Sequence, residues 1–170
     1  MRKFVEADRK KIINILVNSF EGNKSVEFVV GKSQKAREVL MKYSLENCLV
    51  NGEVYISDSG SSCVLIKYSD QKSKPLRLLL WDLKLAISGI GIPKILKVMK
   101  RESNIEGTQP KDPFLYLWFI GVNPNSQGRG EGTKLLNSVL QLANEKNLPV
   151  CLETSTKRNF KWYEKYGFSS

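Results

Sequence analysis

The chain has 170 residues with a hydrophobic content of 41%, which suits one globular domain with its own core. It contains no histidine, so a serine–histidine or cysteine–histidine nucleophile, a histidine-ligated zinc site and a histidine general base are all excluded. Lysine and arginine number 27 against 17 aspartate and glutamate residues, and the resulting net charge of +10 favours anionic partners.

The placement of basic residues and cysteines narrows the class of protein further. The basic residues are spread along the chain without zinc-finger spacing or an RNA-recognition signature, so we expect a solvated basic surface and no specific nucleic-acid binding. The three cysteines, Cys48, Cys63 and Cys151, form no C-x-x-C pair, and no signal peptide precedes them. We therefore predict reduced thiols in a cytoplasmic protein.

Two amphipathic helices and a hairpin are predicted in the first part of the chain. From Ala7 to Phe20, apolar residues recur at helical spacing, with lysine and arginine on the opposite side. A second helix should begin after Ser33, a good N-cap residue, and end near Gly52. An antiparallel hairpin with strands 53–58 and 63–68 follows, because both runs are rich in β-forming residues and a serine- and glycine-rich turn joins them.

The next segment, Leu76 to Lys100, is apolar but interrupted. Charges such as Arg77 and Asp82 exclude an uncharged membrane span of about 18 residues, and Pro93 with its neighbouring glycines splits the segment into two short amphipathic pieces. We interpret residues 76–111 as a helical insertion that forms a lid beside the substrate pocket. Packing into the core and an interfacial membrane helix are the alternatives.

The last part of the chain alternates strands and helices. Residues 114–122 are almost wholly apolar and predict a central strand covered on both faces. A helix at 133–146 presents one apolar face, a strand is predicted at 150–154, and a short helix follows it. Together the elements predict an α/β protein.

The turn between strand 114–122 and the next helix is rich in glycine, at Gly128, Gly130 and Gly132. Glycines let the backbone approach an anion closely, and the free N–H groups that open a helix point at such an anion, so the turn predicts a phosphate cradle. The spacing fits neither the Walker A template nor the dinucleotide fingerprint.

The spacing of Gln127, Gly130 and Gly132 resembles the pyrophosphate loop of the GCN5-related N-acetyltransferase (GNAT) family, whose signature is Gln or Arg, two residues, Gly, one residue, and Gly or Ala. Downstream, residues 163–168 read Tyr-Glu-Lys-Tyr-Gly-Phe and resemble the second acyl-CoA motif of that family. The two motifs also stand in the family's order and at its separation.

This resemblance implies a single GNAT-like acetyltransferase domain over residues 1–170, with a mixed, splayed central sheet flanked by helices. It implies an acyl-CoA-dependent N-acyltransferase that moves an acetyl group from acetyl-CoA to a primary amine by direct attack in a ternary complex. Coenzyme A thioester is then the expected partner and acyl donor, and no metal is expected. The acceptor amine cannot be read from the sequence.

The resemblance also implies the positions of the site residues. Ile120 and Val122 should contact the pantetheine arm in the opened sheet. Tyr163 matches the family's tyrosine general acid, and Glu153, on the strand across the opening, is a possible general base. Asn159 is expected to contact the coenzyme, although the family's usual asparagine position is Thr156 here. The residues expected to bind the pyrophosphate are Gln127, Gly128, Arg129, Gly130, Gly132 and Thr133.

Two departures from the family pattern leave alternatives open. Glu131 places a carboxylate inside the anion-binding loop, where it repels a diphosphate unless it points away. The sequence ends where the family's final strand or strands begin, so strand 150–154 is expected at the edge of the sheet, with a shortened chain, strand exchange in a homodimer, or binding without efficient catalysis as explanations. The alternative functions are a catalytically idle acyl-CoA-binding or interaction module and a basic nucleic-acid binder.

Overall fold

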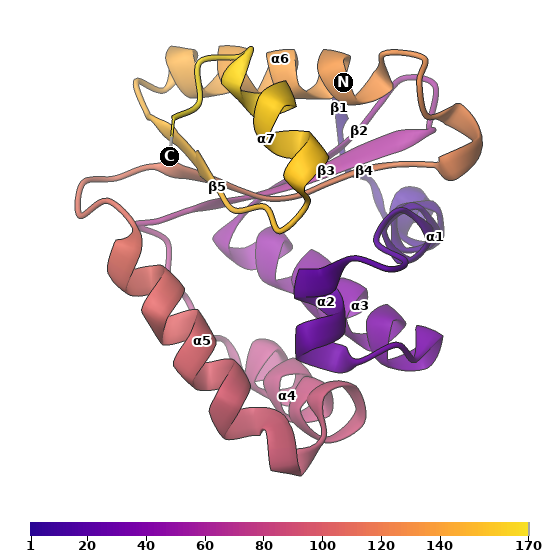
Figure 1. The fold of residues 1–170 in the computed structure, drawn as a ribbon, viewed down its shortest axis with the longest axis vertical. Coiled ribbons are helices and arrows are strands. Elements are labelled where there is room, and N and C mark those ends of the chain that lie inside the picture. The colour runs from indigo at the N-terminus through magenta and orange to yellow at the C-terminus, as the bar shows by residue number, and fades with distance from the viewer. Residues whose placement is uncertain (170) are drawn as a thin grey trace.

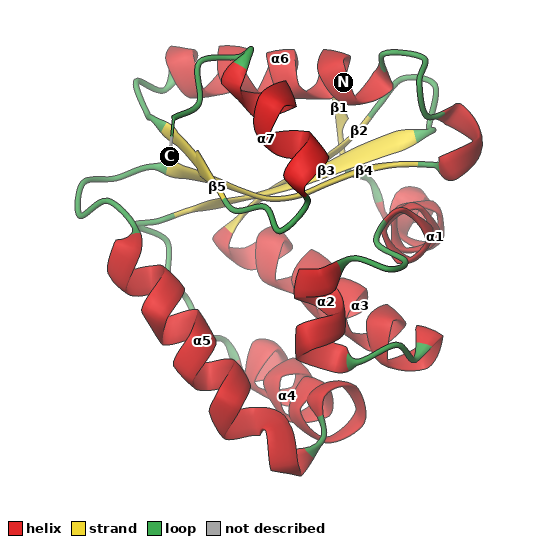
Figure 2. Cartoon of the chain, viewed as in Figure 1, coloured by secondary structure: helices red, strands yellow, loops and turns green. Residues whose placement is uncertain are grey.

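The computed structural model describes residues 1–169, in which five strands form one open sheet in the order β1-β2-β3-β4-β5. Figure 2 shows this sheet between two groups of helices. The first four strands pair antiparallel, and β5 pairs parallel to β4. The strands are β1 (Arg2–Lys3), β2 (Gly52–Ile56), β3 (Ser62–Tyr68), β4 (Leu115–Val122) and β5 (Val150–Leu152).

Helices cover both faces of the sheet. Helices α6 and α7 lie on one face, α1, α2 and α3 lie on the other, and α4 and α5 extend that second group away from the sheet (Figure 1). The helices are α1 (Arg9–Ser19), α2 (Lys24–Val30), α3 (Gln34–Asn51), α4 (Leu76–Lys84), α5 (Ile95–Thr108), α6 (Glu131–Glu145) and α7 (Lys157–Glu164). Four short helical segments complete the fold: three 3₁₀ turns at Glu6–Asp8, Ile92–Lys94 and Pro124–Ser126, and a π-helix at Leu85–Ile90.

The predicted N-terminal elements are confirmed, with one addition. The Ser33 hydroxyl accepts a hydrogen bond from the Ala36 amide at 3.4 Å and so caps α3, as expected. The hairpin is formed by β2 and β3. Helix α2 was not predicted, and it begins because the Asn23 side chain accepts hydrogen bonds from the amides of Ser25 and Val26.

The core has two parts, one on each face of the sheet. Fully buried side chains of α1 and α3, such as Leu16 and Leu45, fill one part, and Leu135 and Leu136 of α6 fill the other. Burying one such side chain is worth about 2 kcal/mol. The sheet is therefore held between two apolar layers.

Strand β4 contributes to both layers, as β3 does, because side chains alternate across a strand, and it also contains a β-bulge. Leu65 of β3 pairs with Phe119, and the next residue, Ile66, pairs with Leu117, so Trp118 is an extra residue in β4. Leu117 consequently packs in the layer under α6, while Phe119 packs in the layer under α1 and α3. The prediction of a strand covered on both faces is confirmed, and the bulge changes which residues face each layer.

The sheet opens immediately after the bulge. Strand β5 pairs with β4 only at Leu115, Tyr116 and Leu117, and from Trp118 onward β4 has no strand partner on that side among residues 1–169. The splayed sheet expected from the family resemblance is therefore present. The predicted strand 150–154 is shorter than expected because pairing ends at Leu152.

Strand β5 is the edge of the sheet within the described part of the chain, as the sequence predicted. The insertion 76–111 is helical, but the prediction of two short pieces is wrong for the second one. Pro93 lies in the 3₁₀ turn before α5, and α5 then runs without interruption from Ile95 to Thr108. Among residues 1–169, no helix has the length and apolar character needed to cross a bilayer.

Candidate active site

The glycine-rich turn connects the end of β4 to the start of α6. Gly128 and Gly130 have φ angles of 78° and 77°, in the left-handed region that favours glycine, and a Cβ added to either would meet no atom within 4 Å. The amides of residues 130–133 have no hydrogen-bond partner among residues 1–169. The turn therefore presents a row of open N–H groups at the positive end of a 15-residue helix.

The third glycine has a different role from the other two. A Cβ on Gly132 would point inward, 3.5 Å from Val122 and 3.9 Å from Trp162 of α7. Gly132 therefore faces the packing between α6, β4 and α7. The neighbouring Thr133 hydroxyl accepts a hydrogen bond from the Tyr166 hydroxyl at 3.3 Å, which ties α7 to the first turn of α6.

The side chains of the turn are exposed. Gln127 lies with its Nε2 atom 3.5 Å from the Val122 carbonyl oxygen, and Arg129 forms no ion pair with any residue in the range 1–169. A guanidinium without a protein partner at the start of α6 is available to an anionic ligand.

Glu131 is held away from the open amides by the β2–β3 turn. Its carboxylate accepts hydrogen bonds from the hydroxyls of Ser59, Ser61 and Ser62 at 2.9, 3.1 and 3.2 Å, and the ammonium group of Lys134 lies 3.7 Å from it. These hydrogen bonds, the one from Ser59 foremost, lower the pKa of Glu131. The carboxylate inside the loop is thus directed to the hairpin turn.

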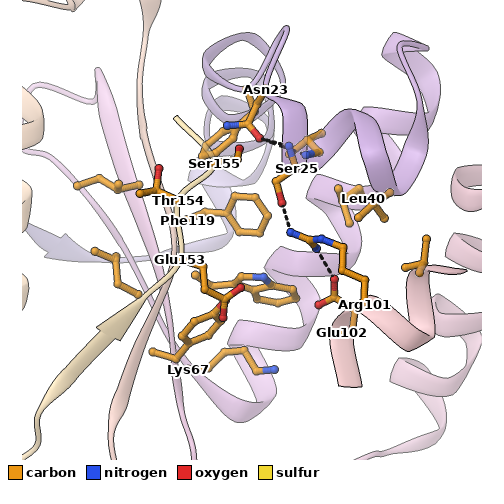
Figure 3. A pocket seen from close by; sticks show the side chains of 18 of the residues that line it. Asn23, Ser25, Leu40, Lys67, Arg101, Glu102, Phe119, Glu153, Thr154 and Ser155 are labelled. Atoms are coloured by element: carbon orange, nitrogen blue, oxygen red, sulfur yellow. Dashed lines mark hydrogen bonds and ion pairs between the residues drawn. The ribbon is translucent and has the colours of Figure 1, made fainter. Parts of the chain in front are cut away.

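The unpaired half of β4 forms one wall of a cavity of about 350 Å³ that extends to α2 and α5 (Figure 3). Ile120, Asn159 and Tyr163, all predicted as site residues, line this cavity, whereas the residues of the glycine-rich turn do not. Six aromatic residues contribute to the cavity walls. These aromatic residues are Phe20, Tyr43, Tyr116, Trp118, Phe119 and Tyr163.

Three carboxylates line the cavity. Glu102 and Glu106 come from α5, and Glu153 follows β5. Figure 3 shows Glu102 and Glu153 extending into the cavity from opposite walls. Burial raises the pKa of Glu102; the adjacent Arg101 opposes this shift, and the charges of Glu153 and Glu106 add to it. Such a cluster attracts a cation and stabilises a bound proton.

Glu153, predicted as a possible base, is positioned by two neighbours. The side-chain amide of Gln109 donates a hydrogen bond to its carboxylate at 3.3 Å. The pKa of Tyr116 is raised by burial and further by the charge of Glu153. The carboxylate therefore stands beside a phenol that stays protonated at neutral pH.

Two cations also line the cavity. Arg101 donates to the Ser25 hydroxyl at 2.6 Å and pairs with Glu102 at 2.6 Å, so its charge is engaged. Lys67 reaches over the ring of Trp118, 4.8 Å from its centroid, and burial lowers its pKa. Lys67 and Glu102 could not be assigned to the site from the sequence, because they lie on elements far from both motifs.

The ring of Tyr163 packs against two other aromatic rings, and the residue borders the cavity. It is 7% exposed and its ring lies 4.7 Å from that of Trp162 and 5.5 Å from that of Phe168. Burial raises the pKa of Tyr163 to about 12. Its phenol is therefore protonated throughout the neutral pH range.

Comparison with known sequences agrees with this architecture. A family model described as an acetyltransferase (GNAT) domain matches residues 96–170. An uncharacterised N-acetyltransferase of Schizosaccharomyces pombe is 30% identical over 97 residues, which is 55% of this chain and 39% of that protein. The match thus covers well under half of that curated relative.

Solved acetyltransferase structures share the fold. One structure from Corynebacterium glutamicum, described as histone acetyltransferase HPA2 and related acetyltransferase, superimposes with a TM-score of 0.70 at 19% identity. The superposition covers 99% of this chain and 83% of that one. Arylalkylamine N-acetyltransferase 2 from Aedes aegypti superimposes with a TM-score of 0.69 at 16% identity, covering 99% and 82%. The chain therefore has the fold of the GCN5-related N-acetyltransferases, and its C-terminal part, residues 96–170, matches the family model of their acetyltransferase (GNAT) domain.

Proposed function

We propose that this protein transfers an acetyl group from acetyl-CoA to a small primary amine by direct attack within a ternary complex. One observation carries the proposal. The unpaired half of β4 runs from a helix start with open amides to a cavity lined by carboxylates. An extended, amide-bearing thioester with an anionic end matches the first part, and a cationic acceptor matches the second.

The donor half of the proposal rests on backbone groups. The amides of residues 130–133 and the unpaired Arg129 suit a diphosphate, with Gln127, Gly128 and Thr133 around it. The strand backbone at Ile120 and Val122 lacks a partner on the open side, which an extended pantetheine arm can supply by pairing as an added strand. Asn159 would contact the same arm from α7.

The acceptor half rests on side chains. Three carboxylates draw an ammonium group into the cavity, and Glu153 or Glu102 takes its proton so that the neutral nitrogen can attack the thioester carbonyl. The aromatic walls favour an amine with an apolar or aromatic body. A volume of about 350 Å³ suits a small molecule.

Tyr163 completes the chemistry as the general acid. The attack forms a nitrogen–carbon bond, breaks the carbon–sulfur bond and leaves a thiolate that needs a proton. With its pKa raised to about 12, Tyr163 keeps its proton until that thiolate forms. A thiolate leaving within the same buried gap also has a higher proton affinity than in water, which favours the transfer.

A panel of small primary amines, assayed by release of free thiol from acetyl-CoA, tests the proposal. We expect turnover with apolar amines, and we expect Tyr163→Phe to lower kcat by roughly 10² to 10⁴ with little change in acetyl-CoA affinity, the usual range for a general acid. Tyr166→Phe is the matched control, since that hydroxyl only bonds Thr133. An unchanged kcat in Tyr163→Phe would remove the assigned role, and donor binding without turnover of any amine would make the protein an acyl-CoA-binding module.

A further inference from the structure

The α4 helix turns its apolar side away from the protein. Leu76, Leu79, Leu80, Leu83 and Ile87 are between 48% and 71% exposed, although they are separated by the helical intervals of three and four residues that place them on one face. On the opposite side, Leu78 and Leu85 are buried. A surface helix of a globular protein has its polar side outward, so this arrangement is reversed.

The apolar face continues into the next helix. Ile92, Leu96 and Met99 are 72%, 80% and 62% exposed. Of the 11 large hydrophobic residues exposed in the described part of the chain, eight therefore lie between residues 76 and 99. We call these eight residues the α4–α5 apolar face. Large apolar side chains exposed in such number within one segment of the chain indicate an interaction surface.

Positive charge surrounds this face. Between residues 76 and 100 the basic residues are Arg77, Lys84, Lys94, Lys97 and Lys100, and the acidic residues are limited to Asp82. By helical position, Arg77 and Lys84 flank the apolar arc of α4 on one side. Lys97 and Lys100 are exposed beside Leu96 on α5.

We propose that the α4–α5 apolar face docks on an anionic lipid membrane, lying in the plane of the interface without crossing it. An apolar helix face flanked by lysine and arginine fits acyl chains below and anionic headgroups around it. A second copy of the chain fits less well, because its identical basic rim would face this one. An acidic protein partner would complement the charge but is not required by the flat, leucine-rich face.

Membrane docking would also set the position of the candidate site relative to the lipid surface. The other side of α5 carries Val98, Arg101 and Glu102, which line the cavity. A single helix thus contacts the membrane with one face and the acceptor cavity with the other. Docking would bring the cavity close to the lipid surface, where amphipathic amines are concentrated.

Co-sedimentation with vesicles tests the proposal on the full chain. The probes are vesicles of phosphatidylcholine alone and of phosphatidylcholine with phosphatidylserine, at an ionic strength of about 0.15 M. We expect binding to the anionic vesicles, at least a tenfold loss of partitioning in Leu80→Glu/Leu83→Glu, and a comparable loss in Lys97→Glu/Lys100→Glu. The matched controls, Val5→Glu and Lys10→Glu/Lys111→Glu, change exposed residues on other elements and should bind as the parent chain does.

Three results would overturn the proposal. These are equal binding to neutral and anionic vesicles, unchanged binding by both test variants, and a concentration-dependent dimer in sedimentation that Leu80→Glu/Leu83→Glu dissolves, which would assign the face to a second copy. Circular dichroism of each variant separates loss of binding from loss of folding. The outcome is independent of acetyl transfer, because the residues changed lie outside the candidate site.

Discussion

The glycine-rich turn before α6 and the cavity beside α5 lie along the same opening in the sheet but offer different groups to a ligand. The turn offers backbone amides, and its side chains are exposed. The cavity offers side chains from several elements, among them three carboxylates and six aromatic rings. A site made of backbone recognises a constant group such as a diphosphate, whereas a site made of side chains can be altered one residue at a time for a different acceptor. The comparison predicts that substitutions in the turn alter acetyl-CoA affinity, whereas substitutions in the cavity alter the use of the acceptor.

The largest effect is expected at the turn. Gly130→Asp places a side chain and a negative charge among the open amides, and acetyl-CoA affinity measured by calorimetry should fall at least a hundredfold, about 2.7 kcal/mol. Gly22→Asp is the matched control, because Gly22 has a φ of 70° and open space around it, as Gly130 does. If both variants bind alike, the turn is not the anion site.

A smaller effect, on the acceptor alone, is expected from Glu102→Gln. The KM for the amine should rise about tenfold, the equivalent of about 1.4 kcal/mol, while acetyl-CoA affinity stays constant. Because burial raises the pKa of Glu102, kcat/KM of the parent protein should fall with decreasing pH already above the ordinary glutamate range, and the variant should lose that part of the profile. Glu145→Gln on α6, away from the cavity, is the control. A change in acetyl-CoA affinity in Glu102→Gln would contradict the prediction that the turn and the cavity act separately.

The smallest effect is expected from Glu131→Gln, which weakens the link between α6 and the β2–β3 turn. The serine hydrogen bonds lower the pKa of Glu131, so its stabilisation is present above the ordinary glutamate pKa and is lost as the pH falls through the lowered value. The melting temperature should drop by no more than a few degrees at neutral pH, and the two proteins should converge in acid. A pH-independent difference would argue against the ionised carboxylate as the cause.

The geometry of the glycine-rich turn could be predicted from sequence because its parts are contiguous. Gln127 to Thr133 form one strand–turn–helix unit, and the turn glycines with positive φ appear as glycines in the sequence. The splay could be expected from family resemblance, but the bulge beside it could not, since the extra residue Trp118 looks like part of an uninterrupted apolar run.

The lining of the cavity could not be predicted because its residues meet only in the folded chain. Lys67, Glu102 and Glu153 lie on β3, on α5 and after β5, and no local pattern relates them. The sequence also left open whether the apolar side of α4 packs into the core or is exposed. Periodicity indicates that a helix has an apolar side, but it does not indicate whether that side is covered.

The open half of β4 has a consequence for the behaviour of the protein before any ligand arrives. The first three residues of β4 pair with strands on both sides. The residues after them have unpaired backbone groups on one side, as in an edge strand. Bare strand backbone is a template for pairing with other chains and hence for aggregation. A ligand that fills the opening with its own amides removes this template, so occupancy of the site would keep the protein dispersed as well as active.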